Sequence, residues 1–218
     1  MTQSAQPDLA PSSAAKRNWF LRHWFISLLA LGIGSCAFII RDRSVSWEEE
    51  VLLNTGETIV VKRWGMYEYG FETGGGYVGY QPNWRSTIEF AYRGRRYEHT
   101  DAAYFMLLAI DPNGAPNLVA LATGYDWHTK NNYHCVVPSY VQFRPDSTGK
   151  QWTWPNQIEP WLHKLPTNLV FGLVPIEANG MKYSAEDRVR ENASSLVMGE
   201  HVRQIDPNFN DQRCLRRN

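Results

Sequence analysis

Hydrophobic and polar residues alternate along much of the chain after residue 44, in short runs separated by turn residues. Alternation over about four to eight residues predicts half-buried β-strands, and a turn sequence between two such runs predicts a hairpin. Four hairpins follow, which pair residues 46–53 with 58–64, 88–92 with 96–99, 104–110 with 118–123, and 136–143 with 151–154. In the first of them, Gly56 can take the left-handed conformation that closes the turn.

Two segments carry helical signals, and one more segment has the composition of a strand. Residues 158–165 are a short apolar stretch bounded by prolines and predict a short helix. Residues 184–198 predict a longer helix, because Ser184 precedes an acidic residue three positions on and Gly199 follows the last turn. We expect one apolar face of this helix to pack on the sheet, formed by Val189, Ala193, Leu196 and Val197. With an additional strand at 168–174, the chain is predicted to be mainly β, built from antiparallel hairpins with a short helix and a C-terminal helix.

The longest apolar run extends from Trp24 to Ile40 and carries no formal charge. At about 1.5 Å per residue, a helix of this length can just cross a bilayer core of about 30 Å. A cleaved signal peptide fits less well, because no small-x-small cleavage site follows the run. Cleavage and lipidation at Cys36 is another alternative, although the apolar residues after it would leave the mature protein starting inside the lipid. We expect an uncleaved transmembrane helix, with the lipid bilayer as the partner of residues 24–40.

Basic residues at the two ends of this run set its orientation. They are Lys16, Arg17 and Arg22 before the run, and Arg41 and Arg43 after it. Because three basic residues precede the run and two follow it, the positive-inside rule places the N-terminus in the cytoplasm. We therefore expect residues 1–18 to be a disordered cytoplasmic tail and residues 19–41 a single-pass anchor in the inner membrane. Residues 44–205 then form a β-rich periplasmic domain, and residues 206–218 form a loose C-terminal tail.

The composition narrows the range of partners. The chain has 22 basic and 22 acidic residues, so its formal net charge is zero. Nucleic-acid binding normally needs a basic face, and we therefore expect no nucleic-acid partner. Nine Trp, eleven Tyr and nine Phe make the chain rich in aromatic residues, which fits β-sheet packing.

The first predicted hairpin resembles a known sequence motif. Residues 46–57 read SWEEEVLLNTGE and are followed by IVVKR at 59–63. This opening resembles a family of proteobacterial envelope proteins, membrane-anchored or lipoproteins, that carry an S-W-x-E-E-V-x-L-x-x-G motif just after the anchor. Residues 135–143 (CVVPSYVQF) and 149–152 (GKQW) are similar to a second segment of that family. The resemblance implies a cell-envelope location and assigns no catalytic residue.

One segment brings together the atoms that zinc prefers. Asp126, His128, His134 and Cys135 supply carboxylate, imidazole and thiol groups within a short stretch. Their spacing matches no established metal motif, and the residues between them are those of a polar loop. We favour a polar loop with surface histidines and predict no metal and no cofactor. The glycine-rich tract at 70–79 lacks the helix start that a phosphate loop needs, so we predict a flexible connection between strands there.

Cys135 and Cys214 are the two cysteines outside the anchor. In an oxidising periplasm we expect them to form a disulfide, which would join the C-terminal tail to the sheet. If the domain is cytoplasmic instead, both are free thiols. The redox state of this pair therefore reports on which side of the membrane the domain lies.

Several tryptophans can form a binding surface. Trp127, Trp152 and Trp154, together with Trp161, could make an aromatic platform, although such residues are more often buried in a core. Trp152 and Trp154 lie two residues apart, so on a strand they face the same side. We expect a membrane-anchored, non-enzymatic binding module of the bacterial cell envelope, whose partner is an envelope protein, a peptide or a glycan.

The alternative function is a metal-dependent or hydrolytic envelope enzyme that uses Asp126, His128 and His134. It requires these three side chains to converge in a concave pocket at metal-compatible distances. A binding module instead predicts an exposed aromatic or apolar patch and no buried cluster of titratable groups.

Overall fold

The structure is a computed structural model that describes residues 43–71, 78–122, 133, 136–155, 157–172, 174–194 and 203–210. The predicted cytoplasmic tail, the anchor at 24–40 and Cys36 lie outside these residues. Within the part of the chain that is described, no helix is both long and apolar enough to cross a bilayer. The residues from Asp42 onward form one compact unit.

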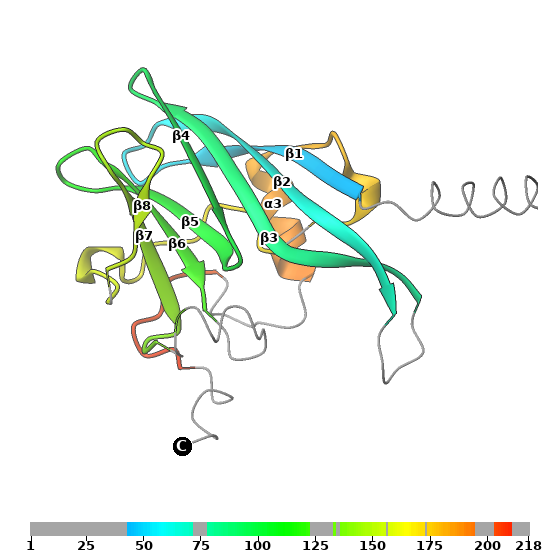
Figure 1. The fold of residues 1–218 in the computed structure, drawn as a ribbon. Helices are drawn as coiled ribbons and strands as arrows, with labels where there is room; N and C mark the ends of the chain where they lie inside the picture. The colour runs from blue at the N-terminus through cyan, green and yellow to red at the C-terminus, as the bar shows by residue number, and fades with distance from the viewer. Residues whose placement is uncertain are drawn as a thin grey trace, which may run out of the picture. The chain divides into compact units, whose positions relative to one another are not determined.

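About half of the described chain folds into two β-sheets (Figure 1). The first sheet has the strand order β4-β3-β2-β1-β9, and the second has the order β5-β6-β7-β8. The strands of the first sheet are β1 (Arg43–Leu52), β2 (Thr58–Phe71), β3 (Val78–Tyr92), β4 (Arg95–Asp101) and β9 (Lys182–Tyr183). Those of the second are β5 (Tyr104–Ile110), β6 (Pro116–Leu121), β7 (Tyr140–Pro145) and β8 (Trp152–Thr153). Neighbouring strands are antiparallel except β1 and β9, so the predicted mainly β fold is confirmed.

All four predicted hairpins form, and their turns lie at one end of the two sheets, at the upper left of Figure 1. Gly56 closes the β1–β2 turn with a φ of 87°, as its predicted left-handed conformation requires. One further hairpin, β2 with β3, is not among the four predicted. Gly70 and Gly79, at the ends of the tract predicted to be a flexible connection, lie within its strands and pair in register. The glycines at 74–76 lie outside the described residues.

An apolar core fills the space between the two sheets. Buried side chains of both sheets contribute to it: Val51, Val61, Ile88 and Phe90 from the first, and Phe105, Leu108, Leu118 and Val141 from the second. Burying a side chain of this kind stabilises the fold by roughly 1.5–3 kcal/mol. The sheets also meet at the edge of β4, where Trp152 Nε1 donates to the Glu98 carbonyl at 2.6 Å. We call the buried residues between the two sheets the apolar core.

The second sheet is buried on its other face as well, by irregular chain segments. Leu162 and Ile205, both fully buried, pack there against β5 and β6. The short helix predicted at 158–165 is present only as a single 3-10 turn, η1 (Pro160–Leu162). A proline begins that turn, and Pro166 disfavours a helical conformation for the residue before it.

The chain after residue 206, predicted to be a loose tail, stays on this same face as far as residue 210. Ser139 N donates to the Phe209 carbonyl at 3.0 Å, and the ring of Phe209 lies 5.6 Å from that of Tyr140. The predicted boundary of the β-rich domain therefore falls inside a packed segment.

Residues 166–172, which we call the strap, run beside the edge strand β5. The strand predicted at 168–174 is wrong, because the strap makes no ladder and is held mainly by side chains. The Asn168 side chain accepts from Leu108 N and donates to Leu108 O, both at 2.8 Å. The Asn54 side chain likewise accepts from Ile110 N at 2.7 Å and donates to Ile110 O at 2.8 Å. Two asparagine amides thus satisfy the free edge of β5 in place of a neighbouring strand.

A buried charged cluster lies between β1, β2 and the strap, and we define it as Trp47, Glu49, Arg63 and Tyr67. The Glu49 and Arg63 side chains are both fully buried and form an ion pair at 2.9 Å. Glu49 also accepts from Trp47 Nε1 and from Val170 N, each at 2.7 Å. The Arg63 guanidinium donates to the Val170 carbonyl and lies 4.9 Å above the Trp47 ring. The charges are therefore paired and hydrogen-bonded, as burial requires.

The helix α3 (Ala185–Ser194) begins at the predicted serine cap. Asp187 N donates to Ser184 Oγ at 3.2 Å, and Ser184 N donates to the Asp187 carboxylate at 3.1 Å. The prediction that an apolar face packs on the sheet is wrong for the described residues, because Val189 is 59% exposed. The polar side of the helix faces inward instead, where Asn192 binds both Phe171 N and Leu169 O. Leu196 and Val197 lie outside the described residues.

Candidate functional site

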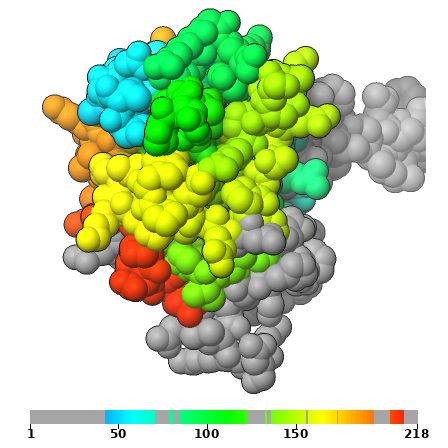
Figure 2. All heavy atoms as spheres, turned by 90° about the vertical axis from the view of Figure 1, so that its left-hand side faces the viewer, coloured from blue at the N-terminus to red at the C-terminus, as the bar shows by residue number. Residues whose placement is uncertain are grey.

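A cavity of about 410 Å³ lies at the end of the domain where the hairpin turns gather. We call it the loop-end pocket. It is lined by Asn54, Thr55, Arg93, Ile110, Asp111, Pro112, Asn113, Gly114 and Trp161. Figure 2 looks onto this end, where the cyan β1–β2 turn, the green turns after it and the yellow segment near residue 160 meet on one face.

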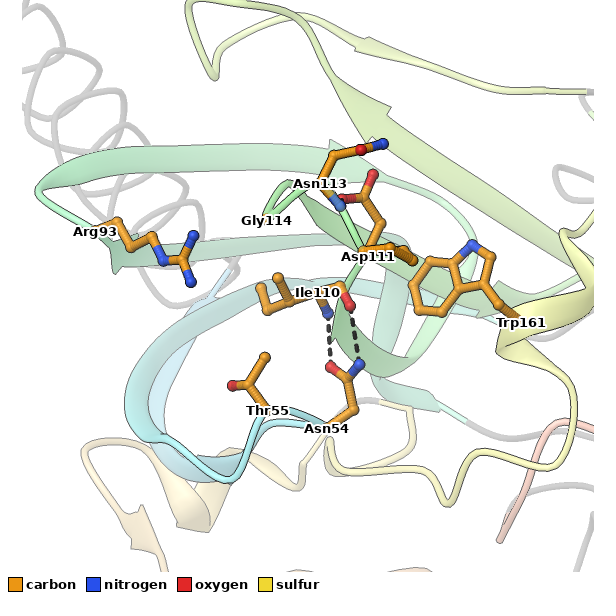
Figure 3. A pocket seen from close by; sticks show the side chains of 9 residues that line it. Asn54, Thr55, Arg93, Ile110, Asp111, Asn113, Gly114 and Trp161 are labelled. Carbon is orange, nitrogen blue, oxygen red and sulfur yellow. Dashed lines mark hydrogen bonds between the residues drawn. The ribbon is translucent and has the colours of Figure 1, made fainter.

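Three hairpin turns build one side of the loop-end pocket, and hydrogen bonds fix two of them. In the β5–β6 turn, Asp111 Oδ1 accepts from Asn113 N at 2.8 Å and from Ala115 N at 2.9 Å. Gly114 completes this turn with a φ of 84°, which a residue with a side chain rarely adopts. The β1–β2 turn is attached to it through the two bonds between Asn54 and Ile110, drawn as dashed lines in Figure 3. The wall of the pocket is therefore largely preformed.

Arg93 supplies a positive charge to the loop-end pocket from the β3–β4 turn. Its guanidinium fits against Gly114, where even a Cβ atom would lie 2.5 Å from Nη1. It also lies 5.2 Å from the Tyr92 ring, a cation–π contact. Among the described residues, no carboxylate forms an ion pair with Arg93. The guanidinium is thus held in place without a direct ion pair, although the Asp111 carboxylate lines the same pocket.

Trp161 forms the opposite wall of the loop-end pocket, across from Arg93 (Figure 3). Its Nε1 donates to Glu159 Oε2 at 2.8 Å, which fixes the orientation of the ring. Glu159 is fixed in turn, because it accepts from Gln142 Nε2 at 3.0 Å and pairs with Arg144. The indole nitrogen is already bonded, so the ring offers its apolar surface to a ligand.

The lining groups are suited to binding. Asp111 has one carboxylate oxygen engaged by backbone N–H groups, and Asn113 and Thr55 add further polar side chains. The lining includes no histidine, cysteine or lysine, and its one carboxylate, Asp111, accepts hydrogen bonds from the backbone of its own turn. A cation, an aromatic surface and several hydrogen-bonding groups are the features of a small-ligand site.

The structure also contains a buried titratable cluster, inside the apolar core, that the sequence did not reveal. The His99 ring packs 4.5 Å from Phe143 and 5.1 Å from Trp152, and its Nε2 has no hydrogen-bond partner among the described residues. Burial lowers the pKa of His99 from 6.5 to about 4, although Asp101, at 4.0 Å, acts in the opposite direction. Burial and then Asp101 raise the pKa of Tyr133. The binding-module hypothesis predicts no buried cluster of titratable groups, and in this respect its prediction is wrong.

Two of the predicted binding tryptophans belong to the periphery of the apolar core. Trp152 and Trp154 are half-buried, pack against that core and share one side, as their spacing predicts. Trp154 makes an edge-on contact with the Tyr133 ring at 4.9 Å. Trp161 packs on the opposite face of the second sheet, so the structure does not join it with Trp152 and Trp154 into one platform.

The remaining predicted site residues lie outside the described part of the chain: Trp127, Asp126, His128, His134, Cys135 and Cys214. Their roles in binding, metal coordination and disulfide formation therefore stay predictions. Within the described ranges, no group of three or more His, Cys, Asp or Glu side chains is placed to hold a metal ion.

Comparison with protein-family models, with curated proteins and with solved structures finds no match for this chain. The resemblance of residues 46–57 to envelope proteins accordingly stays a prediction. The assignment of a function depends on the geometry of the domain.

Proposed function

We propose that this chain is a non-enzymatic binding module of a bacterial cell envelope, and that the loop-end pocket is its ligand site. In this proposal residues 24–40 anchor the protein in the inner membrane by a single pass, and the β-domain extends into the periplasm. The proposed location depends on the apolar run and its flanking charges, whereas the proposed binding role depends on the pocket.

One observation carries the binding role: Arg93 and Trp161 face each other across a cavity of about 410 Å³ whose walls are fixed by hydrogen bonds. A preformed site loses little conformational entropy when it binds a ligand. The guanidinium suits a carboxylate, because the two groups form parallel charge-assisted hydrogen bonds. The indole surface suits the C–H face of a sugar ring.

The ligand class that fits both walls is a saccharide that carries a carboxylate. Asp111, Asn113 and Thr55 lie between the walls and can bind hydroxyl groups. An acidic peptide would use the guanidinium in the same way but would not need these hydroxyl-binding side chains. We therefore favour an acidic glycan over a peptide or an envelope protein.

The test is a binding titration with the full-length chain in detergent, with trigalacturonate as the probe and its methyl ester as the neutral control ligand. We expect binding of the acid and much weaker binding of the ester. Arg93→Gln should weaken binding about tenfold or more, because a hydrogen bond to a charged group is lost. Arg95→Gln is the matched control, since Arg95 is an exposed arginine of the same turn that does not line the pocket.

Equal binding by the Arg93→Gln and Arg95→Gln proteins would exclude the loop-end pocket as the site. Binding of acidic peptides in preference to both sugars would reassign the ligand class. The location is tested separately in intact cells, with a membrane-impermeant thiol reagent. Labelling of Cys135 and Cys214 only after reduction would support a periplasmic domain, and labelling only after lysis would contradict it.

A further inference from the structure

A second cavity, of about 420 Å³, lies between α3 and the strap. We call it the arginine pocket. It is lined by Pro166, Thr167, Arg188, Val189, Asn192, Ala193 and Arg203. Its two charged residues come from different parts of the chain, Arg188 from α3 and Arg203 from the segment that runs beside the strap. Thr167 N donates to the Arg203 carbonyl at 2.9 Å and thereby fixes the backbone of the second arginine.

The arginine pocket has two cations and no carboxylate in its lining. Arg188 is half-buried, its Nη1 donates to the Thr167 carbonyl at 2.8 Å, and its Nε is buried without a partner among the described residues. Arg203 is exposed and forms no ion pair within the described part of the chain. A guanidinium offers five donors, so most of this hydrogen-bonding capacity is unused.

Two carboxylates near this charge, those of Glu49 and Asp187, are engaged elsewhere. Glu49 acts on Arg188 through space, but its oxygens accept bonds from Arg63, Trp47 and Val170. On α3 itself, Asp187 is bound by Ser184 and by Arg190. Burial lowers the pKa of Arg188, which shows that this cation is poorly solvated by its surroundings.

We propose that the arginine pocket binds the phosphate group of a small phosphorylated ligand, between Arg188 and Arg203. One planar guanidinium matches a carboxylate, whereas two that approach from separate elements match the several oxygens of a tetrahedral phosphate. The apolar surface of Pro166, Val189 and Ala193 then lies beside the organic part of the ligand. This site is separate from the loop-end pocket, and the proposal does not depend on the function proposed for that pocket.

The first experiment measures the melting temperature of the full-length chain in detergent, with inorganic phosphate as the probe and sodium chloride at matched ionic strength as the reference. A ligand that binds only the folded state raises the melting temperature. We expect phosphate to raise it by a few degrees and acetate to raise it less. No phosphate-dependent rise in the wild-type protein would overturn the proposal.

The variant Arg203→Gln tests the assignment without disturbing the fold, because the known contact of Arg203 is made by its backbone carbonyl. It should weaken phosphate binding about tenfold or more and leave the melting temperature without phosphate unchanged. Arg190→Gln is the matched control, since Arg190 is an exposed arginine of the same helix outside the pocket lining. Equal phosphate responses in the two variants would overturn the proposal. Arg188→Gln is less informative, because it also removes the bond to Thr167.

Two further probes distinguish the sources of the phosphate group. Glycerol 3-phosphate represents a free metabolite, and dihexanoyl phosphatidylglycerol below its critical micelle concentration represents a lipid headgroup. If glycerol 3-phosphate binds more strongly and its binding is lost in Arg203→Gln, the pocket takes a soluble phosphorylated ligand. If dihexanoyl phosphatidylglycerol binds more strongly and its binding is lost in Arg203→Gln, the pocket takes a lipid headgroup. Binding of either probe that persists in Arg203→Gln would contradict the site.

Discussion

The inner face of the first sheet is covered in two different ways along its length. At one end it meets the second sheet, and the contact is the apolar core. At the other end it meets the strap, and there the contact combines apolar residues such as Val45 and Val170 with the charged cluster. A sheet satisfies its own backbone through its ladders, whereas an irregular segment needs partners for each buried N–H and C=O group.

The backbone N–H groups of Thr167, Asn168 and Leu169 donate to backbone carbonyls, and the strap receives its other partners from side chains. Glu49 and Arg63 bind the backbone of Val170, Asn192 binds that of Leu169 and Phe171, and Arg188 binds Thr167. Tyr67 binds the carbonyl of Val174, just beyond the strap. Buried polar residues are therefore concentrated where the covering layer has no strands, and this difference between the two ends can be tested by mutation.

The largest effect is expected from Arg63→Met in the charged cluster. It leaves the Glu49 carboxylate buried without its cation, which typically costs about 3–5 kcal/mol of unfolding free energy. Lys62→Met is the matched control, because Lys62 directly precedes Arg63 and pairs with Glu48 at 4.0 Å on the exposed face. Its expected cost is below about 1 kcal/mol. Urea unfolding followed by tryptophan fluorescence measures both, and similar losses would refute the structural role of the buried pair.

In the apolar core, Leu108→Ala should cost about 2–5 kcal/mol by the same measurement, because it removes a fully buried side chain and leaves a cavity. Leu108→Met should cost less than about 1.5 kcal/mol, since it nearly conserves volume. Arg63→Lys conserves charge in the charged cluster, yet it should cost more than Leu108→Met, because a lysine cannot reproduce the planar contacts of the guanidinium. If Arg63→Lys costs no more than Leu108→Met, the two ends of the sheet tolerate conservative substitution alike.

His99 places one titratable group inside the apolar core, and stability should therefore depend on pH. The pKa of His99 is about 4 in the folded protein and near 6.5 in the unfolded chain, so the unfolded chain takes up the proton first as the pH falls. The contribution of neutral His99 to the unfolding free energy is fully present above pH about 6.5. It is lost progressively toward pH about 4, and the loss amounts to roughly 3 kcal/mol at most. Unfolding titrations of His99→Phe should lose this slope, and an unchanged slope would assign it to another group.

The smallest effects are expected where asparagine amides replace a strand at the edge of β5. Asn168→Ala leaves Leu108 N and O without partners in a buried environment and should cost about 1–3 kcal/mol. Asn54→Ala should cost less than Asn168→Ala, because Asn54 is exposed and water can replace its amide. Chemical denaturation of the two variants distinguishes them, and equal costs would show that burial does not decide the value of these bonds.

The sequence predicted the parts of the fold that are encoded locally. Turn residues such as Gly56 and Gly114, flanked by alternating strands, identified all four hairpins. The strap was misassigned as a strand because its composition is apolar, and nothing local indicates that side chains from distant elements satisfy its backbone. Glu49 could have been identified, since it shares a strand face with Trp47 and Val51, but its two acidic neighbours suggest solvent exposure.

The loop-end pocket was foreseen only in part. Trp161 is among the candidate aromatic residues, whereas no motif of the sequence singles out Arg93. The two belong to elements far apart in sequence, and only the packing of the two sheets places them across one cavity. The arginine pocket has the same origin, because the polar side of α3 faces inward and its apolar residue Val189 does not.

The closed edge of β5 also limits how this domain can recognise other chains. Many modules capture extended peptides by β-augmentation, in which the ligand adds a strand to an open sheet edge. At β5 the groups that would pair with such a peptide, those of Leu108 and Ile110, are already occupied by the amides of Asn168 and Asn54. A peptide would have to displace both amides to bind there, so recognition at this edge must come from side chains.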